Sequence, residues 1–148
     1  MHTKSKNTGL AGITAQIDES KHKLVDIIKK QKASSAVVSL LKQFLNKTDA
    51  ALNAQNKPVI FPVHASGLTG YFDLKVNKAF IFIDIYQKHV SIRCFTGNKS
   101  INGLKKANWL KGRDNKGSKT FRIRNDSEVE EAVKFACAAY KITYQNIL

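Results

Sequence analysis

Three neighbouring segments in which apolar and polar residues alternate constrain the fold more than any other feature of the sequence. The segments are residues 71–76, 79–86 and 89–95, and the breaks between them are Asn77-Lys78 and Gln87-Lys88. A period of two indicates β-strands. Connections this short can join only antiparallel neighbours, because a parallel crossover needs a dozen or more residues. The centre of the chain therefore predicts an antiparallel sheet.

A fourth strand is predicted at residues 120–124, where apolar and basic residues alternate. Side chains on a strand point alternately to its two faces, so the arginines share one face and the apolar residues share the other. Gly67 and Gly70 precede the strands and mark the change of pattern. The two faces of the fourth strand carry Phe121 with Ile123 and Arg122 with Arg124.

Helical periodicity predicts two helices before the sheet. Residues 10–32 place five aliphatic side chains on one stripe at a spacing of 3.6 residues, namely Leu10, Ile13, Ile17, Leu24 and Ile28. Ser34 and Ser35 can cap a second helix, whose apolar stripe falls within residues 37–52. The short polar break between the two segments predicts a helical hairpin.

A third helix is predicted at the C-terminus, beginning at Asp126 or Ser127. Ser127 and Glu130 match a capping box, and acidic residues in a first helical turn interact favourably with the helix dipole. We expect the apolar side of this helix to cover the sheet. That side carries Val129, Ala132, Val133, Ala136, Cys137, Tyr140, Tyr144 and Ile147.

These elements predict a single α+β domain over residues 1–148. Residues 1–57 form its helical part, and residues 58–148 form an antiparallel sheet with a C-terminal helix packed on it. Residues 97–119 are the longest stretch without a periodic pattern and are expected to form a loop. Loops of this length are usually functional or disordered.

The charge of the chain favours a polyanionic partner. Lys and Arg number 25 against 11 Asp and Glu, which gives a net charge of +14. Residues 97–124, called the basic segment below, contribute nine basic groups and one acidic group, which is more than half of the net charge. Clustered charge creates a local field that attracts anions. We therefore expect a non-enzymatic protein that binds DNA or RNA mainly through backbone phosphates.

Within the basic segment, glycines and asparagines would let the backbone approach a ligand closely. Trp109 is the only tryptophan of the chain, and its indole either stacks on an unpaired base or packs on the core. Lys29, Lys30 and Lys32 are candidate outer contacts. The predicted binding residues are Lys99, Lys105, Lys106, Trp109, Lys111, Arg113, Lys116, Lys119, Arg122 and Arg124.

A nuclease is the alternative function. A metal-dependent nuclease needs at least two carboxylates that converge on Mg²⁺, and the sheet segments offer Asp73 and Asp84. The two would approach each other if their strands paired through Asn77-Lys78. Asp84 could instead form an ion pair with Arg93.

A metal-free ribonuclease would need a base and an acid around the scissile phosphate. His64 and His89 are the candidates, with Arg93 on the strand that follows His89. The four histidines and two cysteines have no zinc-ligand spacing, and the glycines match no nucleotide-binding fingerprint. No cofactor is therefore expected, apart from Mg²⁺ for a nuclease.

A third function class is an adaptor for an acidic protein. The N-terminus lacks the apolar core of a secretion signal, and no apolar run is long enough to span a bilayer. We therefore expect a cytoplasmic protein, or one associated with the nucleoid or nucleus, without membrane insertion. Cys94 and Cys137 have apolar neighbours and are expected to be reduced thiols, with a bridge between them as the alternative. The oligomeric state stays open.

Overall fold

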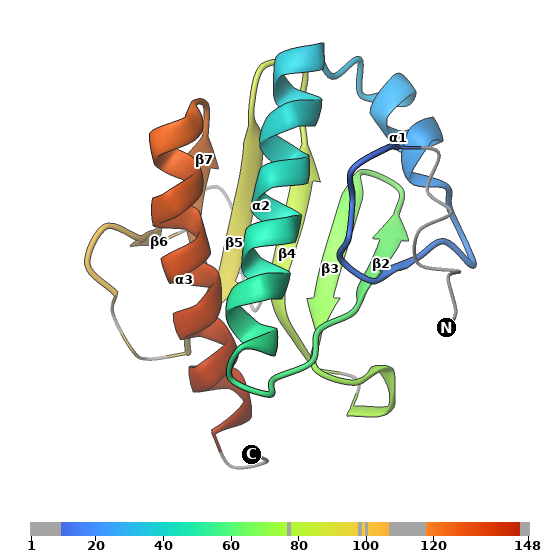
Figure 1. Ribbon diagram of the computed structural model, residues 1–148. Coiled ribbons are helices and arrows are strands. Elements are labelled where there is room, and N and C mark those ends of the chain that lie inside the picture. The colour runs from blue at the N-terminus through green and yellow to red at the C-terminus, as the bar shows by residue number, and fades with distance from the viewer. Residues whose placement is uncertain (1–9, 77, 98, 100, 107–117, 146–148) are drawn as a thin grey trace.

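The computed structural model describes residues 10–76, 78–97, 99, 101–106 and 118–145. These residues form an α+β fold with three α-helices and a single mixed sheet (Figure 1). The helices are α1 (Leu24–Lys30), α2 (Ser35–Asn53) and α3 (Asp126–Tyr144). The strands are β1 (Ile17–Asp18), β2 (Phe61–His64), β3 (Gly67–Tyr71), β4 (Ala79–Ile85), β5 (Val90–Phe95), β6 (Lys105–Lys106) and β7 (Ser118–Ile123).

The described strands follow the order β1-β2-β3-β4-β5-β7-β6 across the sheet. β1 pairs with β2 in parallel, and every other pair is antiparallel. The predicted strands at β4, β5 and β7 are confirmed. The expected sheet of about four strands was too small, because β1, β2, β3 and β6 have only two to five residues each and leave little periodic signal in the sequence.

The predicted strand at residues 71–76 is wrong. The partner of β4 is β3, which ends at Tyr71 and is followed by a short 3₁₀ helix at Leu74–Val76. Gly67 and Gly70 lie inside this strand. A Cβ on Gly67 would lie 1.9 Å from the carbonyl oxygen of Ile83 on β4, so the close approach of the two strands requires glycine there.

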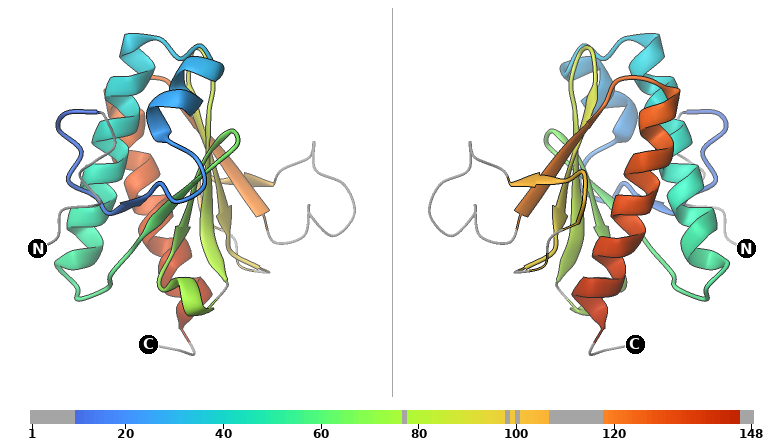
Figure 2. Two further views of the ribbon diagram at one scale, coloured as in Figure 1. Left: turned by 90° about the vertical axis from the view of Figure 1, so that its right-hand side faces the viewer. Right: turned by 90° about the vertical axis from the view of Figure 1, so that its left-hand side faces the viewer.

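Both long helices lie on one face of the sheet, as the view along the sheet shows (Figure 2). The residues of β4 and β5 that face these helices are fully buried, whereas Phe82, Asp84 and Arg93 on the opposite face are partly exposed. The predicted packing of the C-terminal helix on the sheet is confirmed. The buried side chains of these two strands are Phe80, Ile81, Ile83, Ile85, Val90, Ser91, Ile92 and Cys94.

α2 forms as predicted, but its neighbour does not. The hydroxyl oxygen of Ser34 accepts a hydrogen bond from the backbone N–H of Val37 at 3.2 Å and caps the helix. α2 packs along α3, to which it is tied by an ion pair between Lys47 and Glu130 (Figure 1). The two predicted N-terminal helices are present as α1 and α2 with a short connection between them, but α2 packs along α3 instead of forming a hairpin with α1.

The predicted helix at residues 10–32 is reduced to α1, because other contacts hold the chain before it in an extended form. Asn46 on α2 accepts a hydrogen bond from the backbone N–H of Thr14 at 2.8 Å and donates one to the carbonyl of Gly12 at 2.6 Å. The carbonyl of Gln16 accepts a hydrogen bond from the N–H of Phe61 in β2 at 2.9 Å. Residues 13–17 alternate between buried and exposed, as a strand does.

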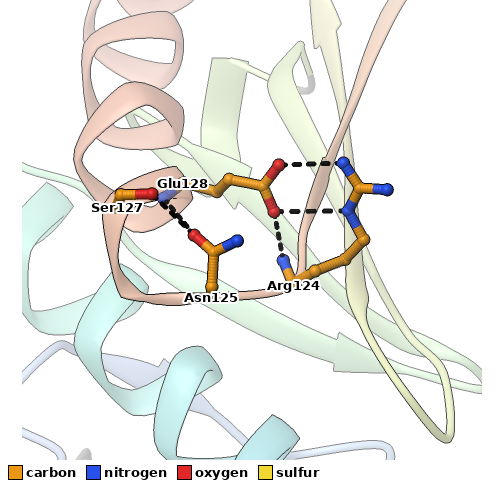
Figure 3. Close-up of polar contacts among 4 residues, drawn as sticks. All are labelled: Arg124, Asn125, Ser127 and Glu128. Carbon is orange, nitrogen blue, oxygen red and sulfur yellow. Dashed lines mark hydrogen bonds and ion pairs between the residues drawn. The ribbon is translucent and has the colours of Figure 1, made fainter.

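α3 begins at Asp126 as predicted, although its cap differs from the predicted one (Figure 3). Asn125 is the capping residue, and its side-chain oxygen accepts from the backbone N–H of Glu128 at 3.0 Å. Ser127 donates its hydroxyl to the same oxygen at 2.7 Å, and Glu130 pairs with Lys47. The predicted capping box of Ser127 and Glu130 is therefore wrong, because the helix begins at Asp126 and Ser127 lies inside its first turn.

Candidate functional site

The face of the sheet away from α2 and α3 is not covered by either long helix (Figure 2). Two rows of side chains cross it, because residues paired across a ladder point to the same face. One row joins Asp84, Ser91 and Arg122, and the other joins Phe82, Arg93 and Thr120. We call the surface formed by these six residues the open face.

An aromatic and basic cluster occupies the middle of the open face. The guanidinium carbon of Arg93 lies 4.6 Å from the ring centroid of Phe82, within the range of a cation–π contact. The ring of Phe95 packs edge-on against Phe82 with a centroid distance of 5.1 Å. Phe82, Arg93 and Phe95 are all half-buried, so each side chain packs partly against the sheet and partly faces solvent.

Asp84 is engaged by two neighbours. Its Oδ2 lies 3.8 Å from Nε of Arg93, and its Oδ1 accepts the hydroxyl of Ser66 at 3.2 Å. The expected ion pair between Asp84 and Arg93 is therefore present. The side chain of Asp84 is only 13 % exposed, which limits its access to a bound metal or substrate.

His64 lies beside this group. Its Nδ1 accepts the backbone N–H of Ser66 at 3.3 Å. Burial lowers the pKa of His64 below its ordinary value of 6.5, and the positive charge of Arg93 lowers it further, while Asp84 acts in the opposite direction. The surroundings of His64 therefore disfavour the protonated form of its imidazole.

Asp73 and Asp84 do not converge. Asp84 pairs with Gly67 at the beginning of β3, whereas Asp73 lies beyond the end of β3, where its Oδ1 accepts the backbone N–H of Lys75 at 2.9 Å. The expected approach of the two carboxylates through Asn77-Lys78 is therefore wrong, because β3 pairs with β4 in a different register. Within the described residues, no three His, Cys, Asp or Glu side chains are grouped so as to hold a metal ion.

His89 lies at one end of the open face. Its ring stacks on that of Tyr86, with centroids 4.7 Å apart and an angle of 21° between the ring planes. Burial lowers the pKa of His89, and Arg122 and Arg124 lower it further through charge repulsion. His89 is therefore part of a basic surface and lies apart from the Asp84–Arg93 pair.

The same end of the sheet collects basic residues from three elements. α1 adjoins the β4–β5 turn, because Gln31 donates its side-chain amide to the carbonyl of Ile85 at 3.0 Å and the N–H of Ser34 bonds to the carbonyl of Gln87 at 3.1 Å. Val90 of β5 pairs with Ile123, the last residue of β7, which brings Arg122 and Arg124 on either side of Ile123 to this end. We call the surface formed by these residues the basic end: Lys29, Lys30, Lys32, Tyr86, Lys88, His89, Arg122 and Arg124.

Two described strands of the basic segment, β7 and β6, end the sheet on one side, with β6 as the edge strand. Lys105 and Lys106 form β6 and pair with Thr120 and Lys119 of β7, so the predicted loop at 97–119 contains strand residues. Lys119 donates its ammonium to the carbonyl of Gly97 at 3.4 Å, and Lys99 is exposed. Four predicted binding residues lie outside the described part of the chain, namely Trp109, Lys111, Arg113 and Lys116.

Sequence reasoning did not assign a binding role to Tyr86, which is 42 % exposed. The sequence feature that could have indicated such a role is the alternation within residues 79–86. It places Tyr86 on the same face of its strand as Phe82 and Asp84. Cys94 and Cys137 are free thiols, as expected.

Comparisons with models of protein families, with curated proteins and with solved structures find no match. Among the described residues, no helix has the length and apolar character needed to cross a bilayer.

Proposed function

We propose that this protein binds nucleic acid through the open face, the basic end and the basic segment, without catalysing a reaction. The observation that carries the proposal is the position of Arg122 and Arg124. Both are exposed, Arg122 on β7 and Arg124 directly after it, and β7 is the strand that joins the open face to the edge strand β6. A ligand on the open face would meet Arg122 there and Arg124 at the adjoining basic end.

The distribution of charge supports a polyanion. The basic segment carries a net charge of +8, whereas residues 125–148, which include α3, carry −2. Positive charge clustered in one segment creates a local field, and such a field attracts a phosphate chain over a distance of about 10 Å at ordinary ionic strength. Binding of this kind depends on phosphates and has little sequence preference.

The test compares two double variants that remove the same charge. Arg122→Gln with Arg124→Gln removes two cations from the basic end, and Lys134→Gln with Lys141→Gln removes two exposed cations from α3. We expect the first variant to weaken binding of labelled oligonucleotides, measured by fluorescence anisotropy, by about tenfold at low salt. We expect the second to bind like the wild type. An equal loss in both would mean that net charge acts without a defined interface.

Two other function classes have direct assays. Both oxygens of the Asp84 carboxylate already have a partner, in the ion pair with Arg93 and the hydrogen bond from Ser66. We therefore expect labelled oligonucleotides to stay intact with and without Mg²⁺. Cleavage that Asp84→Asn or His89→Ala abolishes would make the protein a nuclease. A stable protein complex that survives nuclease treatment of a lysate would indicate an adaptor.

A further inference from the structure

Tyr86 and His89 form a pair of stacked rings at the end of the β4–β5 hairpin, in which Tyr86 is exposed and His89 is half-buried. Tyr86 and Leu74 are the two large hydrophobic side chains that are exposed among the described residues. The turn fixes the position of the pair, because the backbone N–H of Tyr86 donates to the carbonyl of His89 at 3.0 Å. The ring centroids are 4.7 Å apart and the ring planes differ by 21°, so each ring covers one face of the other and the pair offers a flat outer aromatic face on which a base could continue the stack.

Cations surround this aromatic surface. Arg122 and Arg124 are close enough to His89 to lower its pKa, and Lys88 is exposed in the same turn. The carboxylate near this group belongs to Glu128, which Arg124 engages through its guanidinium. A flat aromatic surface bordered by cations matches the two parts of a nucleotide, since the base has an apolar face and the phosphate is anionic.

We propose that Tyr86 and His89 stack on an unpaired base, which makes single-stranded nucleic acid the preferred partner. This inference rests on the proposed function and specifies its substrate. In a duplex the faces of the bases are covered by their neighbours, so a stacked aromatic pair can contact a base only where the strand is single. Every base has such a face, so the contact adds affinity without sequence preference.

The test measures the affinity for a labelled oligothymidylate of about 12 nucleotides, a length within the range that small single-strand-binding folds occupy. Tyr86→Ala removes the ring, and Tyr86→Phe keeps the ring and removes only the hydroxyl. We expect Tyr86→Ala to weaken binding roughly 5- to 100-fold, the range found when an aromatic stacking residue is replaced by alanine, and Tyr86→Phe to bind like the wild type. Leu74→Ala removes an exposed apolar side chain far from the basic end and should have no effect.

Salt dependence separates stacking from phosphate contact. Tyr86→Ala should leave the slope of log affinity against log salt unchanged, because the ring carries no charge. Arg122→Gln should make that slope shallower by about 0.7 on a single strand. A duplex of the same length should bind the wild type and Tyr86→Ala alike.

Each outcome bears on one of the two proposals. If Tyr86→Ala and His89→Ala both bind the oligothymidylate like the wild type while Arg122→Gln binds more weakly, the stacking surface is wrong and nucleic-acid binding stands. If the wild type binds neither the single strand nor the duplex, nucleic-acid binding fails and the stacking surface fails with it. Thermal unfolding of each variant checks the fold, and His89→Ala replaces Tyr86→Ala if the latter is unfolded.

Discussion

Arg124 and Glu128 meet at two points where β7 leads into α3. Nη2 of Arg124 lies 3.0 Å from Oε2 of Glu128, and Nε lies 3.3 Å from Oε1 (Figure 3). Oε1 also accepts the backbone N–H of Arg124 at 2.8 Å. The arrangement orients the guanidinium and at the same time places a competing carboxylate beside a proposed phosphate contact.

Glu128→Gln should therefore strengthen nucleic-acid binding. The substitution keeps the size of the side chain and removes the negative charge next to Arg124, and an exposed ion pair of this kind corresponds to about a two- to fivefold change in affinity. The measurement is oligonucleotide affinity at low salt. Glu131→Gln removes the same charge from an exposed position on α3 and serves as the control. If the two variants bind alike, Arg124 makes no phosphate contact.

Stability should fall as the pH drops below about 6.5. Burial, as the largest cause, lowers the pKa of both His64 and His89 in the folded protein below the ordinary value of 6.5. The unfolded chain therefore binds more protons in this range, and the free energy of unfolding decreases with decreasing pH. Urea unfolding at about pH 7.5 and about pH 5.5 measures the difference.

A double variant assigns this pH dependence to the two histidines. His64→Gln with His89→Gln should flatten it, whereas His22→Gln, at an exposed position on the chain before α1, should change it only slightly, because the charge of His22 is the smallest cause of the lowered pKa of His64. An unchanged slope in the double variant would show that other groups cause the effect.

Gly67→Ala should be strongly destabilising. A Cβ at this position would lie 1.9 Å from the carbonyl oxygen of Ile83, so β3 and β4 would have to move apart. We expect a loss of about 3 kcal/mol in the free energy of unfolding, at the upper end for overpacking. Gly12→Ala is the control, because no atom lies within 4 Å of its Cβ and only its positive φ of 90° opposes the change. That strain costs about 1 kcal/mol, and equal losses in the two variants would contradict the account.

Two tyrosines should contribute to stability through their hydroxyl groups. Tyr140 donates to the carbonyl of Pro58 at 2.7 Å, and Tyr144 donates to the carbonyl of Lys78 and accepts the N–H of Phe72 at 3.1 Å. Each bond joins α3 to a loop at the end of the sheet. Tyr140→Phe and Tyr144→Phe should each lower the free energy of unfolding by about 1 kcal/mol. Tyr86→Phe, at an exposed position, should change it by less than about 0.5 kcal/mol. A loss of about 1 kcal/mol in Tyr86→Phe as well would show that the buried hydrogen bonds are not the cause.

The N-terminal segment shows how a sequence pattern can fit two structures. Ile13 and Ile17 are four residues apart, which suits one face of a helix, but with Ala15 they also form the buried side of an extended segment. Alanine is too small to reveal this alternation in the sequence. The bonds from Asn46 of α2 decide the outcome, and they come from a residue about thirty positions away. Long-range contacts of this kind cannot be read from local periodicity.

The strands next to β4 show a second limit of local patterns. β4 and β5 could be predicted because their apolar residues alternate over six or seven positions with a short turn between them. β3 has glycine at two of its five positions, and glycine ordinarily marks a turn. Gly67 is there because β4 approaches closely, a tertiary requirement that the sequence does not display. Because β3 was not recognised, the segment after it, which includes Asp73, was predicted as the strand that pairs with β4.

The candidate site could be predicted in part. The basic residues of β7 and their shared face follow from alternation alone, and so does the pairing of Asp84 with Arg93 on adjacent strands. The meeting of α1 with the β4–β5 turn could not be predicted, because it depends on the path of the chain before α2. The basic end is a product of that meeting, and Tyr86 gains its proposed role from the cations around it.

The most direct test of the central claim is the salt dependence of oligothymidylate binding. If six basic residues contact phosphates of a single strand, log affinity should fall with log salt at a slope of about −4. Replacing Lys105, Lys106, Lys111 and Arg113 of the basic segment by Gln should reduce the slope to about −1.5 while the protein stays folded. A slope near zero in the wild type, or the same slope in the variant, would contradict a phosphate-binding surface that includes the basic segment.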